Sequence, residues 1–141
     1  MAILRNRIVT SKKPVRKRQR VPRTHAGETW TKSRYFQFIR SALRQAFSRY
    51  PVKFQVKNAA KRTLKKKKGN QRYEYLCAEC AGYFKGNEVD CDHIVQAGSL
   101  TTYEHLPGFV ARLFCEADGL QILCKPCHKR KTKEDRENGK L

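Results

Sequence analysis

The clearest pattern along the chain is an apolar face with helical spacing between residues 30 and 50. Its members recur three or four residues apart, as the buried face of an amphipathic helix requires. They are Phe36, Ile39, Leu43, Ala46 and Tyr50. Thr31 suits the N-cap, and Pro51 is expected to end the helix because proline cannot continue it. The pattern therefore predicts one amphipathic helix from about residue 31 to residue 50.

The stretch that follows is polar and strongly basic. It runs from Ala59 to Lys68 with four consecutive lysines and then reaches Gly69 and Asn70. Glycine followed by asparagine is typical of a helix end or a turn. We predict a short basic helix that ends at this pair.

From residue 73 onward, short apolar runs replace the helical pattern. Such runs between turn residues predict strands at Tyr73–Leu76, at Val89–Val95 and at Leu120–Leu123. A helix is expected from about residue 107 to residue 117. A second one follows the last strand, since Pro126 suits a first helical turn.

Charge divides the 141-residue chain into unlike halves. Lys and Arg number 32 against 12 Asp and Glu, a net charge of +20. Residues 1–72 hold 23 of the basic residues and one acid, whereas residues 73–141 hold 9 basic and 11 acidic residues. We therefore predict a basic flexible arm over 1–29, a basic helical extension over 30–72 and a separate domain over 73–141. Such asymmetry favours a nucleic-acid partner.

The sequence predicts neither a membrane-spanning helix nor a secretory signal. The apolar runs fall well short of the roughly 18 residues that a membrane-spanning helix needs. The first nine residues alternate apolar and basic side chains and contain no apolar core of a secretory signal. Six cysteines without an export signal favour reduced thiols, and hence metal ligation, over a disulfide framework.

Four of the cysteines form two CxxC pairs, at Cys77 and Cys80 and at Cys124 and Cys127. Two such pairs supply the four thiolates of a tetrahedral structural zinc site. A redox-active CxxC is the alternative, but it needs one pair rather than two. The remaining two, Cys91 and Cys115, are expected to be small buried apolar residues.

A second site is expected between the two CxxC pairs. Asp92 and His93 are neighbours on a predicted strand and so project to opposite faces unless the strand ends there. Cys127 and His128 lie about 100° apart around a helix, so one can face the zinc while the other faces away. The sequence thus predicts a closed thiolate site and an open site with a carboxylate and imidazoles.

Together these motifs resemble the small zinc-containing HNH endonucleases of bacteriophages. The resemblance covers residues 73–133 and is carried by Cys77–Cys80, Asp92-His93-Ile94 and the run from Leu120 to Thr132. It implies an α+β fold of the ββα-metal (HNH) type. In that fold a hairpin and a helix are held together by the four-cysteine zinc site. In this chain they would follow the basic disordered arm and the amphipathic helix.

The resemblance also implies roles for three residues. His93 matches the general base that takes a proton from the attacking water. Asp92 and His128 match the ligands of a catalytic divalent ion, Mg²⁺ or alternatively Mn²⁺ or Ni²⁺. One position departs from the family, because Gly119 stands where an asparagine that pins the loop is usual. The preceding Asp118 is a candidate to replace it.

The interpretation is a metal-dependent DNA endonuclease or nickase whose cationic extension binds double-stranded DNA. Candidate DNA contacts are Lys131, Arg40, Arg44, Lys65, Lys66, Lys67 and Lys68. A phage protein of this kind would act inside the bacterial cytoplasm, and phage packaging or replication proteins stay open as partners. Two alternatives remain: a non-catalytic basic zinc protein that binds nucleic acid, and a nuclease inactivated by the change at Gly119.

Overall fold

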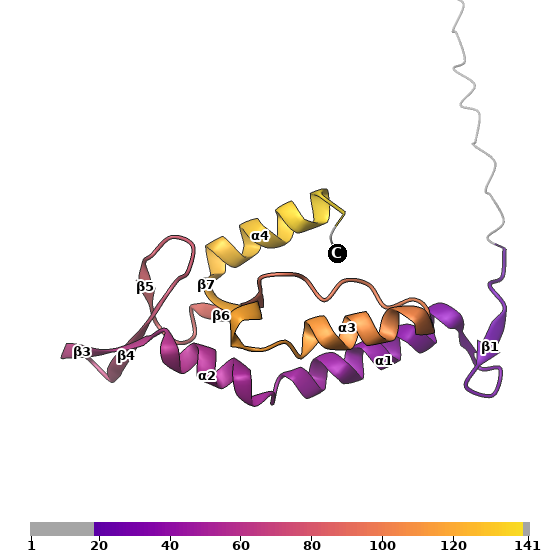
Figure 1. Cartoon of the computed structure of the whole chain (residues 1–141), viewed down its shortest axis with the longest axis horizontal. Helices are drawn as coiled ribbons and strands as arrows, with labels where there is room; N and C mark the ends of the chain where they lie inside the picture. Colours follow the sequence, from indigo (N-terminus) through magenta and orange to yellow (C-terminus); the bar gives the residue numbers. More distant parts are fainter. Residues whose placement is uncertain (1–18, 140–141) are drawn as a thin grey trace, which may run out of the picture.

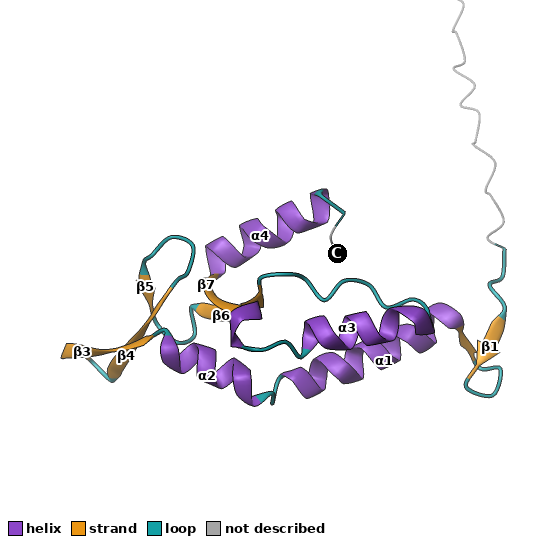
Figure 2. Cartoon of the chain, viewed as in Figure 1, coloured by secondary structure: helices purple, strands orange, loops and turns teal. Residues whose placement is uncertain are grey.

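The computed structural model describes residues 19–139 as an elongated α+β molecule (Figure 1). Its strands form three small antiparallel sheets, β1–β2, β3–β4–β5 and β6–β7 (Figure 2). The strands are β1 (Arg23–His25), β2 (Trp30–Thr31), β3 (Lys61–Lys68), β4 (Gln71–Leu76), β5 (Tyr83–Phe84), β6 (Val89–His93) and β7 (Leu120–Cys124). The α-helices are α1 (Lys32–Phe47), α2 (Pro51–Ala59), α3 (Leu106–Leu113) and α4 (Lys125–Glu137). Short 3₁₀ turns span Tyr103–His105 and Ala117–Gly119. The mixed α+β class is therefore confirmed.

The predicted amphipathic helix is present as α1. Thr31 caps it, since its hydroxyl accepts a hydrogen bond from the backbone N–H of Arg34 at 3.3 Å. Phe36 and Phe47 are its buried residues. The helix ends at Phe47, and Pro51 occupies the first turn of the next helix, α2, where its missing N–H costs nothing.

The predicted basic helix over 59–68 is wrong, because this segment is the strand β3. It pairs with β4 in the register Lys61↔Tyr75, Arg62↔Glu74 and Thr63↔Tyr73. Gly69, at φ +61°, makes the turn between the strands. A lysine run has no apolar period that would hold it as a helix, and pairing with β4 decides its state. The expected division between residues 72 and 73 falls inside β4.

The N-terminal arm also differs in part from its prediction. Residues 1–18 lie outside the described residues. Arg23–His25, however, form β1, which pairs with β2 immediately before α1. The last part of the expected flexible arm is thus a short hairpin on the end of the helical layer (Figure 1).

Apolar packing creates two clusters that both include residues of the β6–β7 hairpin. The larger one joins α1, α3 and the start of β7 through Phe36, Phe47, Leu100, Phe109, Leu113 and Leu120. The smaller one contains Leu123 and three cysteines, with Phe84 packed against it. The start of β7 therefore packs in the larger apolar cluster, and its end packs in the cysteine-containing one.

The segment of most interest is β6–β7 followed by α4. Its two strands pair from Val89↔Cys124 to His93↔Leu120, so the predicted strand over 89–95 ends at His93. α4 lies on one side of this hairpin, and α1 and α2 lie on the other (Figure 1). None of the helices within residues 19–139 is both long enough and apolar enough to cross a membrane.

Candidate metal and active site

The four CxxC cysteines converge as predicted. Their sulfur atoms all lie within 4.8 Å of one another, with Cys80 Sγ and Cys124 Sγ 3.9 Å apart. Zinc–sulfur bonds of about 2.3 Å in a tetrahedron place the sulfurs about 3.8 Å apart, so the cluster has the dimensions of a four-thiolate metal site.

Backbone hydrogen bonds position this cluster. The N–H of Ala78 donates to the carbonyl of Ile122 at 2.8 Å, which fastens the first CxxC turn to β7. The N–H of Cys77 donates to the carbonyl of Gly82 at 2.9 Å. The N–H of Cys124 donates to the sulfur of Cys77 at 3.3 Å and links the two pairs. The site therefore joins the end of the β3–β4 hairpin to the start of α4.

The thiols of this cluster differ in acidity. Burial acts to raise the pKa of Cys77, but backbone hydrogen bonds from Cys80, Cys124 and Glu79 outweigh it and lower this pKa to about 6. The thiol of Cys127 is instead raised to a pKa of about 12, first by its hydrogen bond with Cys124 and then by burial. Four sulfurs without carboxylate or imidazole form a ligand set for a soft or borderline cation, and zinc is among the metals that such tetrahedral sites bind.

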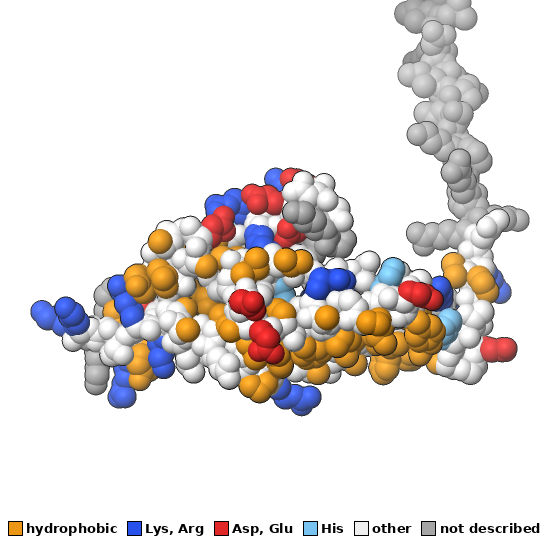
Figure 3. Space-filling view, in the orientation of Figure 1, with side chains coloured by type: hydrophobic (Ala, Val, Ile, Leu, Met, Phe, Trp, Pro, Cys, Tyr) orange, Lys and Arg blue, Asp and Glu red, His pale blue; other side chains and the backbone are white. Residues whose placement is uncertain are grey.

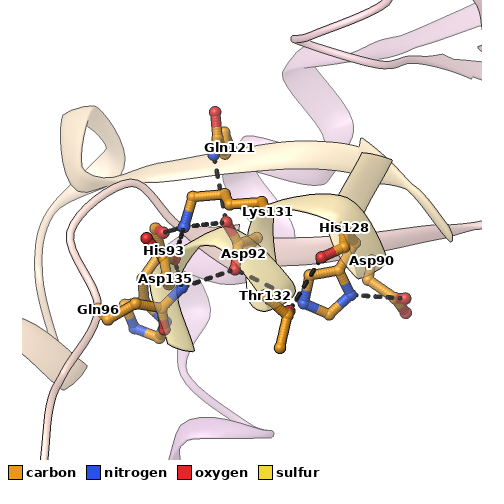
Figure 4. A network of polar contacts seen from close by, with 9 residues as sticks. All are labelled: Asp90, Asp92, His93, Gln96, Gln121, His128, Lys131, Thr132 and Asp135. Carbon is orange, nitrogen blue, oxygen red and sulfur yellow. Dashed lines mark hydrogen bonds and ion pairs between the residues drawn. The ribbon is translucent and has the colours of Figure 1, made fainter. Parts of the chain in front are cut away.

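Asp92 is the centre of the second site. Its carboxylate is almost fully buried, and its two oxygens have different neighbours (Figure 4). Oδ2 lies 3.1 Å from Lys131 Nζ and 3.2 Å from Gln121 Nε2. Oδ1 lies 3.5 Å from Gln96 Nε2 and 3.6 Å from His128 Nε2. Oδ2 is thus held by close donors, whereas Oδ1 faces the imidazole.

The ring of His128 lies between two carboxylates. Its Nδ1 is 3.3 Å from Asp90 Oδ2, and its Nε2 faces Asp92 (Figure 4). A carboxylate accepts hydrogen bonds, so Nδ1–H donates to Asp90, and in the tautomer that carries only this proton the lone pair lies on Nε2. The preceding residue, Cys127, lies in the thiol cluster, as the helical spacing of the pair predicts.

This arrangement fits a hard divalent cation. Two ligand atoms about 2.1 Å from one ion lie about 3.0 to 4.2 Å apart, and the Asp92–His128 separation of 3.6 Å falls in that interval. Within residues 19–139, the four cysteines are the one group of three or more potential ligands. Asp92 and His128 would therefore leave most positions of the ion to water and phosphate oxygen, as Mg²⁺ prefers.

His93 points to the other face of the hairpin. Its ring lies 4.7 Å from the ring of Phe47, centroid to centroid, and its Nε2 is 2.8 Å from the carbonyl oxygen of Leu113. A carbonyl only accepts, so Nε2 carries the hydrogen and Nδ1 is the basic nitrogen of the neutral ring. The structure brings Asp92 and His128 together and places His93 in a nearly buried position on the α1 side.

Lys131 has a different environment from that of a phosphate contact. Its ammonium lies 2.9 Å from the carbonyl oxygen of His93, 3.0 Å from Asp135 Oδ2 and 3.1 Å from Asp92 Oδ2. Three protons thus meet three acceptors inside the protein. Burial acts to lower the pKa of Lys131, but the bonds to Asp135 and Asp92 raise it above its usual value. In this structure Lys131 is an internal cation that holds Asp92.

The glycine that departs from the family pattern is explained by packing. A Cβ at Gly119 would lie 2.6 Å from Cys115 Sγ and 2.9 Å from Cys115 Cβ. The carbonyl of Gly119 accepts a hydrogen bond from the N–H of Ile94 at 2.9 Å. The main chain therefore ties this loop to the end of β6, in place of the side chain expected from Asp118.

The other predicted DNA contacts lie away from Asp92 and His128. Arg40 and Arg44 belong to α1, on the opposite side of the hairpin from α4 (Figure 1). Lys65 and Lys66 are exposed on β3, at the end of the molecule where Figure 3 shows a group of basic side chains. The side chains of Lys67 and Lys68 lie outside the described part of the chain.

Sequence reasoning missed four residues of the polar network, Asp90, Gln96, Gln121 and Asp135. Asp90 lies two residues before Asp92 on one strand and so shares its face, which the period of two could have indicated. Asp135 is four residues after Lys131 on one helix. The two glutamines carry no signal in the sequence that distinguishes them from surface residues.

Comparison with known proteins gives one informative match. The chain is 39% identical over 64 residues to a "Probable HNH endonuclease" of Lactococcus phage SK1. The match covers 45% of this chain and 61% of that relative, so the chain spans about three fifths of its length. No protein-family model and no solved structure matches the chain. Together with the four-cysteine cluster, the match confirms the resemblance to small phage HNH proteins.

Proposed function

We propose that this protein is a metal-dependent HNH endonuclease or nickase that hydrolyses phosphodiester bonds of DNA. The observation that carries the proposal is the pair of unlike ligand atoms, Asp92 Oδ1 and His128 Nε2, set 3.6 Å apart beside the end of β6. A structural zinc in the four-cysteine cluster belongs to the same proposal. The name of the phage relative supports the assignment, and a phage enzyme of this kind would act in the cytoplasm of its host.

The chain's own residues divide the work as follows. Asp92 and His128 hold a divalent ion, which when bound supplies positive charge to the phosphate under attack. Lys131 and Gln121 hold Asp92 Oδ2 and thereby leave Oδ1 facing His128 Nε2, where the two would hold the ion. His93 is the candidate general base, and with its Nε2–H committed to Leu113 the proton would go to Nδ1. This role requires the attacking water to reach the face of the hairpin on which the ring packs against Phe47.

Cleavage of supercoiled plasmid tests this proposal. The zinc-loaded protein is expected to nick or linearise the plasmid with added Mg²⁺, Mn²⁺ or Ni²⁺. Asp92→Ala, His128→Ala and His93→Ala should each lose at least about a hundredfold of that activity. His105→Ala, a change to a histidine outside the site, is the matched control and should cut at the wild-type rate. Zinc content and circular dichroism of each variant separate lost chemistry from lost folding.

One observation favours a second function, a non-catalytic zinc protein that binds nucleic acid. His93 is only 8% exposed and its ring packs on Phe47, which is also the environment of a structural histidine. In that case no metal supports cleavage, DNA binding persists, and His93→Ala lowers stability without a catalytic effect. The same plasmid assay, combined with thermal unfolding of His93→Ala, separates the two functions.

A further inference from the structure

A groove of about 800 Å³ opens beside α4, next to the Asp90–His128 pair. Its charged walls are mostly cationic. Besides Asp90 and His128, they include Lys125, Lys129, Arg130, Lys133 and Arg136. Four of these cations are spaced four, four and three residues apart along α4, so they share one face of the helix.

A second groove, of about 700 Å³, flanks the site on its other side. It is lined by Glu104 and Asp135 against one cation, Arg112. The first groove therefore carries five cations and one carboxylate, and the second carries one cation and two carboxylates. Asp135 is already paired with Lys131, which leaves Glu104 and Arg112 of opposite sign in the second groove. A polyanion is therefore attracted more strongly to the first groove.

Most cations of the first groove are not engaged in strong ion pairs within the described part of the chain, so they can contact a ligand. Lys125, Lys129 and Arg136 form no ion pair with any described residue. Lys133 has one exposed partner, Glu137, at 3.8 Å, which is worth little in water. Arg130 is the exception, because Glu79 holds it against the thiol cluster. Lys131, on the same helix, is fully committed to internal acceptors.

We infer that the basic face of α4, formed by Lys125, Lys129 and Lys133, is the track for the DNA phosphate backbone that leads to Asp92 and His128. This inference rests on the proposed function for its substrate. A backbone that follows this face passes the exposed edge of His128. It lies on the opposite side of the hairpin from Arg40 and Arg44 of α1 (Figure 1). The α4 lysines, rather than Lys131 or the α1 arginines, therefore make the phosphate contacts nearest the site.

Binding of a fluorescent duplex by the full chain, with no divalent ion added, tests the track without cleavage. One variant combines Lys125→Ala, Lys129→Ala and Lys133→Ala. Its matched control, called the α1 variant, combines Arg40→Ala and Arg44→Ala of α1 with Arg49→Ala in the turn that follows this helix. It removes the same charge from the other side of the hairpin. The N-terminal arm is identical in both and contributes equally.

We expect the α4 variant to bind at least tenfold more weakly at about 0.15 M salt. Affinity should also depend less steeply on salt. The magnitude of the slope of log affinity against log salt concentration should decrease by about 0.9 per lost contact, or about 2.7 for three contacts. The α1 variant should change by less than a third of that. Equal losses in both variants, or a larger loss in the α1 variant, would overturn the inference.

Failure of this inference and failure of the proposed function give different results. If the wild type never cuts DNA but the α4 variant binds it more weakly, the α4 face is the phosphate track and the proposed hydrolysis is wrong. A protein that cuts, yet binds independently of the α4 lysines, is a nuclease with its phosphate track elsewhere. Circular dichroism confirms that α4 remains helical in the variant, as substitution of exposed lysine by alanine should allow.

Discussion

The carboxylate of Asp90 lies 3.3 Å from Nδ1 of His128, and the other nitrogen of that ring faces Asp92. This contact commits Nδ1 to donating and leaves Nε2 free to ligate. Asp90 is therefore expected to act as a positioning residue, because a carboxylate behind a ligating histidine fixes the tautomer and orientation of the ring.

Asp90→Ala should lower the affinity for Mn²⁺ by about 10- to 100-fold, since the imidazole loses its fixed orientation. Isothermal titration of the zinc-loaded protein with Mn²⁺ measures this directly, without an assay of cleavage. Asp90→Asn keeps an oxygen that can accept from Nδ1 and should recover part of the loss. Glu137→Ala, at an exposed acid at the end of α4, is the charge-matched control. Equal affinities for Asp90→Ala and this control would refute the positioning role.

Lys131 is expected to stabilise the fold by neutralising Asp92 and Asp135. Lys131→Met should cost about 2–3 kcal/mol of unfolding free energy, because it leaves two largely buried carboxylates without their cation. A divalent ion at Asp92 can restore part of that neutralisation. Added Mn²⁺ should consequently raise the melting temperature more in Lys131→Met than in the wild type. Thermal unfolding with and without Mn²⁺ tests both statements, and an unchanged stability would contradict them.

The four-cysteine cluster should bind zinc and hold the β3–β4 hairpin to β7. Cys77→Ser is expected to lose the metal and to lower the melting temperature by roughly 10 °C or more, because metal binding is coupled to folding. The amide of Ala78, which donates to Ile122 across this junction, should then exchange with solvent much faster. Zinc content by elemental analysis and hydrogen exchange provide the measurements.

Cys91→Ser is the control for this experiment. Burial raises the pKa of the Cys91 thiol to about 11, so at neutral pH it stays protonated and packs with the apolar core. The variant should retain its zinc and the slow exchange of Ala78. Loss of zinc from Cys91→Ser as well would show that the metal site is not the set of four cysteines assigned here.

The sequence was informative where one local rule decides the structure. The regular CxxC spacing located the thiol cluster, and the spacing of Phe36, Ile39 and Leu43 located α1. It failed for Lys61–Lys68, because a lysine run has no apolar period and its state depends on the partner strand β4. The alternation of a strand gave opposite faces for Asp92 and His93, but the sequence could not show that His93 packs against Phe47 and hydrogen-bonds to Leu113.

Gly119 and Cys115 should be thermodynamically coupled, because a Cβ at position 119 would lie 2.6 Å from Cys115 Sγ. Gly119→Asn, which restores the residue usual in HNH proteins, is expected to cost about 1–3 kcal/mol through this overlap. Cys115→Gly removes both atoms that the new side chain would meet. The double variant should therefore be more stable than the sum of the two single changes predicts, with a coupling of at least about 1 kcal/mol. Urea unfolding of the four proteins in the cycle measures this term, and additive losses would show that Cys115 does not determine the glycine at position 119.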